Sequence, residues 1–99
     1  MAKYVLTNKA VKDLSDIWEY TFDNWSERQA DKYYQMLIEN CKELSKNPNL
    51  GKNYEGVLNR LFGLKTGRHI IFYRIENANE IEITRILHVQ MDLKNRIKE

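Results

Sequence analysis

Cysteine is almost absent from this chain of 99 residues, which contains only Cys41. A single cysteine excludes an intrachain disulfide and any metal site that needs several thiolates. Cys41 falls on the apolar face of an expected helix, so we interpret it as a small buried residue. Long apolar runs are missing as well, since none approaches the ~20 residues of a membrane span, and the N-terminus lacks the pattern of a signal peptide. These absences predict a soluble, cytoplasmic protein made of one domain, residues 1–99.

A strong charge of one sign is also lacking. The formal net charge of +2 is too small to indicate nucleic-acid binding by itself, and we expect no direct sequence-specific binding of nucleic acid. The chain has neither a glycine-rich phosphate loop nor the spacing of metal ligands, so the sequence indicates no cofactor and no metal. The basic residues are unevenly distributed, because arginine outnumbers lysine after Asn59.

The chain is organised around two strand-like runs between Gly67 and Leu87. Residues 68–75 and 81–87 are rich in Ile, Phe and Tyr, which favour the pleated surface of a sheet. The residues between them, 76–80, include two asparagines, which tolerate the left-handed backbone conformations of turns. Two strands joined by so short a loop pair antiparallel, so this stretch predicts a β-hairpin.

The loop also suggests a register for the hairpin. With Ile75 opposite Ile81, Arg74 pairs with Glu82, and these opposite charges favour the register by roughly 0.2–1 kcal/mol. Side chains alternate between the two faces of a strand, so we expect one face to be the core and the other to be the working face. The core face carries Ile71, Tyr73, Ile75, Ile81, Ile83 and Leu87, with His69 and Arg85 as its polar members. The working face pairs Phe72 with Thr84, Ile70 with Ile86 and Arg68 with His88.

The remaining segments predict two helices and two more strands. Residues 4–7 and 60–65 are typical of strands, and apolar residues recur at helical spacing between them. A first helix, capped by Thr7 or Asn8, ends near Asn24, and a second, capped by Ser26, ends at Asn47-Pro48. The short connection makes them a helical hairpin. With a short helix in the tail, the order β-α-α-β-β-β predicts an α+β fold, in which the helical hairpin packs on a small antiparallel sheet.

Several of these residues resemble a known family. The run Gly-Arg-His-Ile-Ile-Phe-Tyr-Arg at 67–74, followed by Arg-Ile-Leu-His at 85–88 and Met91-Asp92, resembles the ParE toxins of the RelE/ParE superfamily. Ile17-Trp18 on the first helix and the Asn-Pro-x-Leu-Gly segment at 47–51 support the resemblance. It covers nearly the whole chain in the right order, and it implies the same β-α-α-β-β-β fold.

The resemblance also implies a function. It indicates the toxin of a type II toxin–antitoxin system, which inhibits growth and stabilises plasmids and is neutralised by a ParD-like antitoxin. ParE toxins act on DNA gyrase, whereas RelE toxins cut messenger RNA on the ribosome. We expect a gyrase inhibitor that acts by binding, and a RelE-type ribosome-dependent mRNA endoribonuclease is the alternative. The assembly implied is a toxin homodimer or a heterotetramer with the antitoxin.

The placement of the basic residues favours binding over catalysis. Cleavage of RNA through its 2′-OH needs a base, an acid and cations on the scissile phosphate. Arg68 and Arg74 are separated by roughly 20 Å along one strand, at about 3.3 Å per residue, which is too far for both to grip one phosphate. Arg85 lies on the apolar face and needs a carboxylate partner, because an unpaired buried charge is costly. Asp92 is the candidate partner.

We therefore expect no catalytic residues, and we separate the candidate contacts by partner. Candidates for target binding are Arg68, Arg74, Arg85, His88, Met91, Asp92, Lys94 and Arg96. Candidates for antitoxin binding are Trp18, Trp25, Tyr34, Leu61 and Leu64, in a groove between the helical hairpin and the sheet margin at residues 61–65. An acidic, amphipathic antitoxin segment would suit such a groove. The alternative for both tryptophans is packing within the helical hairpin.

Overall fold

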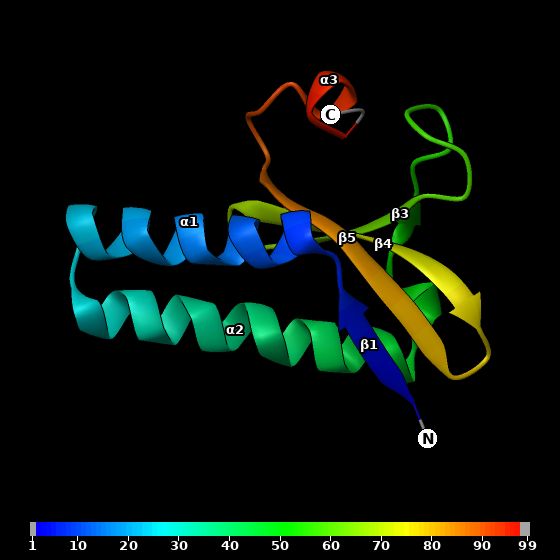
Figure 1. Cartoon of the computed structure of the whole chain (residues 1–99), viewed down its shortest axis with the longest axis horizontal. Coiled ribbons are helices and arrows are strands. Elements are labelled where there is room, and N and C mark those ends of the chain that lie inside the picture. The colour runs from blue at the N-terminus through cyan, green and yellow to red at the C-terminus, as the bar shows by residue number, and fades with distance from the viewer. Residues whose placement is uncertain (1, 98–99) are drawn as a thin grey trace.

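The protein consists of a five-stranded sheet with two long antiparallel helices beside it (Figure 1). The computed structural model describes residues 2–97, apart from the side chain of Lys94. The strands follow the order β1-β5-β4-β3-β2 across the sheet. The elements are β1 (Lys3–Leu6), α1 (Asn8–Asn24), α2 (Glu27–Lys46), the 3-10 turn η1 (Pro48–Leu50), β2 (Lys52–Asn53), β3 (Phe62–Thr66), β4 (His69–Asn77), β5 (Glu80–His88) and α3 (Leu93–Ile97). None of the helices in this described range is long and apolar enough to cross a membrane.

This arrangement confirms the predicted α+β fold class, including the helical hairpin and the short helix in the tail. It adds the two-residue strand β2 beside β3. The sheet is mixed, however, and not purely antiparallel as predicted, because β1 lies parallel to β5. Parallel neighbours need a long connection, and the helical hairpin together with the three strands before β5 supplies it.

Both long helices begin at the predicted capping residues. The Thr7 hydroxyl accepts the backbone N–H of Ala10 (3.1 Å), and the Ser26 hydroxyl accepts that of Gln29 (3.1 Å). Each bond satisfies a donor that the first turn of a helix leaves free. α2 ends at Lys46, directly before Asn47-Pro48, as predicted.

The β4–β5 hairpin keeps the predicted register in its middle part. Ile75 lies opposite Ile81 and Arg74 opposite Glu82. The pairing then shifts by one residue, between Tyr73 and the residue before it. A second irregularity lies between Ile75 and Asn77, where Asn77 pairs with Glu80, so the predicted register is correct only for residues 73–75 of β4.

The shift is a β-bulge in which Thr84 is the extra residue. Phe72 lies opposite Arg85 and not opposite Thr84 as predicted. The Thr84 hydroxyl donates to the Phe72 carbonyl (3.3 Å), so the side chain of the extra residue bonds across the bulge. At the far end of the hairpin, His88 consequently faces His69, whereas the sequence predicts Arg68 in that place.

The bulge also exchanges two side chains between the faces of the sheet. Ile86 joins the core under the helices, and Leu87 turns to the opposite face, the reverse of the prediction. One inserted residue sends every later side chain to the other face. The buried members of the helix-side core are Ala10, Leu14, Leu37, Cys41, Leu44, Ile71, Tyr73, Ile81, Ile83 and Ile86.

The other face of the sheet holds a second core and is not the open working face that the sequence predicts. Its buried members are Leu61, Ile70, Phe72 and Leu87, with Tyr54, Val89, Leu93 and Ile97 packed against them. Two of these partners belong to α3, so the tail docks on the sheet and covers apolar surface. Burial of this kind stabilises a fold by roughly 25 cal/mol per Å².

Side chains of α1 and of its N-cap Thr7 bond to the edge of β5 where β1 stops. β1 ends opposite Ile83, and beyond that point the Thr7 hydroxyl donates to the Thr84 carbonyl (2.8 Å). The Asp13 carboxylate then accepts the backbone N–H of Ile86 (3.0 Å). Both bonds satisfy strand groups that a longer β1 would have paired.

Asp13 also binds the guanidinium of Arg85 at two points. Nε of Arg85 lies 2.8 Å from Oδ2, and Nη2 lies 3.0 Å from Oδ1. The two side chains are only 13% and 11% exposed, and Nη1 of Arg85 donates to the Arg96 carbonyl of α3 (2.8 Å). Asp92 is therefore not the carboxylate that holds Arg85, contrary to the prediction; it accepts the side-chain amide of Asn95 (2.7 Å).

We predict that Asp13→Ala lowers the free energy of unfolding by about 3–5 kcal/mol. The substitution removes both the two-point contact of a nearly buried guanidinium and the acceptor of the Ile86 N–H. Chemical denaturation followed by circular dichroism measures the loss. Asp16→Ala, which breaks the exposed pair with Lys12 on the same helix (2.9 Å), is the control and should cost far less. Equal losses for the two variants would contradict the structural role of Asp13.

Candidate functional site

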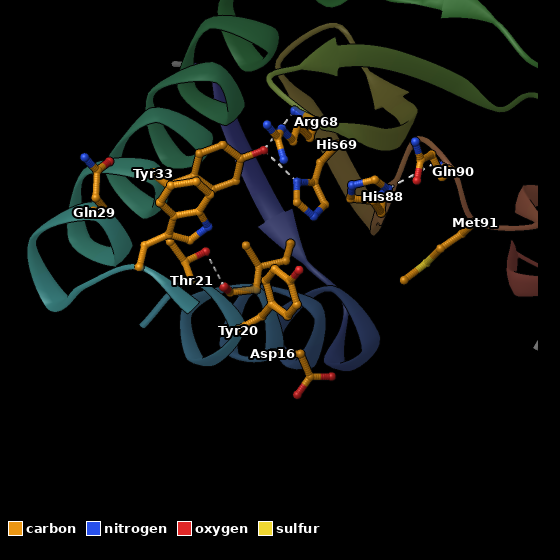
Figure 2. A pocket seen from close by; sticks show the side chains of 12 residues that line it. Asp16, Tyr20, Thr21, Gln29, Tyr33, Arg68, His69, His88, Gln90 and Met91 are labelled. Atoms are coloured by element: carbon orange, nitrogen blue, oxygen red, sulfur yellow. Dashed lines mark hydrogen bonds between the residues drawn. The ribbon is translucent and has the colours of Figure 1, made fainter. Parts of the chain in front are cut away.

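An open pocket of about 790 Å³ lies where β4 begins and β5 ends (Figure 2). Its walls come from α1, from the first half of α2 and from the segment that follows β5. Figure 2 shows both histidine rings and the Tyr33 hydroxyl on the sheet side of this space. The lining residues are Asp16, Ile17, Tyr20, Thr21, Trp25, Gln29, Tyr33, Arg68, His69, His88, Gln90 and Met91.

Tyr33 fastens the turn from β3 to β4 to the second helix. Its hydroxyl oxygen accepts the backbone N–H of Arg68 (3.0 Å) and lies 2.6 Å from Nδ1 of His69. Gly67, in the same turn, has a φ of +61°, and a Cβ added there would lie 2.8 Å from that hydroxyl oxygen. Only glycine adopts this backbone conformation at no cost and leaves room for the phenol. Burial raises the pKa of Tyr33, so the phenol stays protonated at neutral pH.

His69 and His88 lie opposite each other on β4 and β5. Their ring centroids are 5.3 Å apart, and the rings are nearly perpendicular, at 84°. Burial, with a smaller contribution from the neighbouring His88, lowers the pKa of His69 to about 4. His69 is therefore neutral at physiological pH, and a neutral imidazole has one donor nitrogen and one acceptor nitrogen.

The structure brings together three of the predicted target-binding residues: Arg68, His88 and Met91 all line the pocket. The others lie elsewhere. Arg74 is in the middle of β4 opposite Glu82, Arg85 is held by Asp13, and Asp92, Lys94 and Arg96 belong to the tail, with the Lys94 side chain outside the described residues. The eight candidates therefore do not converge on one site.

Several pocket residues lie outside the sequence prediction. The sequence places His69 among the core residues of the hairpin. The feature that could have marked it as a pocket residue is a polar side chain at an otherwise apolar strand position. Tyr33 shows only the helical spacing that any packing residue shows. Tyr20 and Gln29 carry no signal, because their place in the pocket depends on how the helices lie against the sheet.

The predicted antitoxin-binding residues do not form one groove. Trp18 and Tyr34 line a smaller pocket of about 330 Å³ on the helical hairpin, whereas Trp25, 68% exposed, lines the larger pocket. Leu61 is completely buried in the second core, and half-buried Leu64 packs against the helix-side core. The sheet margin at residues 61–65 therefore does not join the tryptophans as the sequence predicts.

Sequence comparisons relate this chain to toxins over nearly its whole length. Residues 4–93 match the family model described as the ParE toxin of the type II toxin–antitoxin system parDE. The chain is 29% identical over 96 residues to Toxin ParE1 of Mycobacterium tuberculosis, a match that covers 97% of this chain and 98% of the relative. It is 31% identical over 94 residues to Toxin ParE1 of Caulobacter vibrioides, which covers 95% and 96% of the two chains.

Solved structures share the fold. A chain of the chromosomal ParDE toxin–antitoxin system from P. aeruginosa superposes with a TM-score of 0.78 at 25% identity, covering 91% of this chain and 98% of that one. The RelBE2 toxin–antitoxin complex of Mycobacterium tuberculosis has a chain with a TM-score of 0.68 at 21% identity, covering 88% and 96%, and this likeness concerns the fold alone. From the family match, the full-length relatives and the fold together, the chain belongs to the ParE toxin family of type II toxin–antitoxin systems.

Proposed function

We propose that this toxin inhibits DNA gyrase by binding it, performs no covalent chemistry of its own, and is neutralised by a ParD-like antitoxin. Gyrase binding without covalent chemistry is supported by one observation: in this member of the ParE family, the basic side chains are dispersed and do not meet at one site. Arg85 is engaged by a buried carboxylate, and Arg74 lies in mid-strand beside Glu82. Among the basic side chains that the structure describes, Arg68 alone lies with the two histidines.

A ribonuclease needs more than the pocket offers. RNA cleavage calls for a base and an acid on either side of the scissile phosphate and for cations that stabilise its developing charge. Nδ1 of His69 is already engaged with the Tyr33 hydroxyl (2.6 Å), and a group with a pKa of about 4 is a weak base at neutral pH. The arrangement therefore supports a binding protein better than a ribosome-dependent nuclease.

The tail is the proposed contact surface for gyrase. Its apolar side is occupied, because Leu93 and Ile97 pack against the second core. Met91 is 41% exposed, and Asp92 and Arg96 are exposed as well. A short helix held by one side and charged on the other presents fixed polar groups to a partner at little entropic cost.

We predict that the purified protein inhibits gyrase supercoiling and leaves messenger RNA intact in a translation extract. Arg96→Glu should weaken gyrase inhibition by about tenfold, because reversing one charge at an interface opposes the partner's charge. The backbone contact between Arg96 and Arg85 does not depend on the altered side chain. Lys42→Glu, at an exposed position of α2, is the matched control and should inhibit like the unaltered protein. Message cleavage together with normal gyrase activity would refute the proposal and favour the RelE-type alternative.

The proposed antitoxin contact is an apolar stripe on α1, formed by Val11, Trp18 and Phe22. Val11 is 52% exposed and Phe22 45% exposed. Trp18 stacks on Phe22 with ring centroids 5.2 Å apart, and its Nε1 donates to Asp31 of α2 (3.0 Å). Residues at this spacing share one helix face, and exposed apolar patches commonly mark binding sites for partners. An amphipathic antitoxin segment would lay its apolar anchors here, and the net positive charge of the toxin favours acidic residues beside them.

We predict that Trp18→Ala weakens binding of a ParD-like antitoxin by at least tenfold, since buried tryptophans dominate protein interfaces. Isothermal titration calorimetry measures the affinity. Leu58→Ala alters an exposed apolar residue (38%) in a loop distant in sequence, and it is the control. Hydrogen exchange in the complex should show protection on α1. Protection confined to residues 49–58, with none on the helices, would count against this placement.

A further inference from the structure

Hydrogen bonds hold the two imidazoles of the larger pocket in place. The backbone N–H of Gln90 donates to Nδ1 of His88 (3.1 Å). The Tyr33 hydroxyl accepts the backbone N–H of Arg68, lies 2.6 Å from Nδ1 of His69 and lies 3.5 Å from the Thr66 carbonyl. A nitrogen that accepts a hydrogen bond carries no proton, so His88 carries its proton on Nε2. The sheet thus presents the Nε2–H donor of His88 in a fixed position, next to the imidazole of His69, which has one donor and one acceptor nitrogen.

These donors share the pocket with a cation. Arg68 directly precedes His69 and is exposed at the same end, and Figure 2 shows it beside His69, next to the Tyr33 hydroxyl. The carboxylate among the lining residues, Asp16, points away from the histidines in Figure 2 and is paired with Lys12 (2.9 Å). A fixed N–H donor and a guanidinium favour a ligand group that only accepts hydrogen bonds and carries negative charge, and a phosphate fits this description.

The opposite walls of the pocket are apolar and aromatic. Ile17, Tyr20, Trp25 and Met91 line them, and the two aromatic side chains are 66% and 68% exposed. Exposed aromatic rings beside a cationic group are a stacking surface for nucleobases, which binds every base because each has a π-face. The volume of about 790 Å³ is within the range of small-ligand sites.

We propose that this pocket binds a nucleotide, with the phosphate at Arg68, His69 and His88 and the base against Tyr20 and Trp25. The site does not depend on gyrase inhibition, so either proposal can fail without the other. The same chemistry is available from a free mononucleotide and from the terminal nucleotide of a nucleic acid.

The test is a titration of the full chain with adenosine 5′-monophosphate. The chain has two tryptophans, so Trp18→Phe leaves Trp25 as the single reporter in the pocket wall. A saturable change in its fluorescence is expected. Arg68→Ala and His88→Ala, each introduced into this background, should weaken binding by about tenfold, the effect of losing one charge-assisted hydrogen bond. Lys42→Ala, at an exposed position of α2, should leave the affinity unchanged.

Further ligands test the phosphate and base subsites separately, and they distinguish a free mononucleotide from the terminal nucleotide of a nucleic acid. Adenosine and inorganic phosphate should each bind more weakly than the nucleotide. A 5′-phosphorylated oligonucleotide that binds more tightly than the mononucleotide would support the site and assign it to a nucleic-acid end, and weaker binding would assign it to the free nucleotide. The proposal is overturned if none of these ligands gives a saturable change. It also fails if Arg68→Ala and His88→Ala leave the affinity for adenosine 5′-monophosphate unaltered while circular dichroism shows both variants folded.

Discussion

One extra residue in β5 determines how the rest of the structure is arranged. The bulge at Thr84 moves the pairing of the hairpin by one position, and two consequences follow from that step. His88 comes to lie opposite His69, and Ile86 enters the helix-side core. A regular hairpin of the same sequence would separate the two imidazoles and turn a leucine, not an isoleucine, toward the helices.

Much of the fold could be predicted from local patterns. The caps at Thr7 and Ser26, the helix stop before Pro48 and the pairing of Arg74 with Glu82 depend on residues only a few positions apart, and the structure confirms each of them. The resemblance to ParE toxins rests on short motifs and is confirmed by the family match. Local patterns suffice here because caps, turns and amphipathic faces are set by neighbouring residues.

The site was harder to predict, because it depends on contacts between distant segments. Nothing near Thr84 signals a bulge, since threonine suits a regular strand equally well. The partner of Arg85, Asp13, lies 72 positions away on α1. Asp92 is nearer in the sequence but bonds to Asn95 instead. The second core was not predicted for the same reason. Its members Leu61 and Phe72 and the tail residue Ile97 are far apart in the sequence and come together only when the sheet forms. The Ile-rich face alone does not reveal that the other face is covered too.

The parallel pairing of β1 has a consequence for synthesis of the chain. Thr7 and Thr84 are bonded across 77 positions, whereas α1 and α2 have all their mutual contacts once residue 46 has been made. A chain emerging from the ribosome can therefore form its helical hairpin early, but β1 has no strand to pair with until residues 80–83 appear. Contacts over such separations form late because loop closure must precede them. During translation the nascent toxin is consequently an incomplete sheet, and it becomes a folded molecule only after nearly all of its residues have been joined.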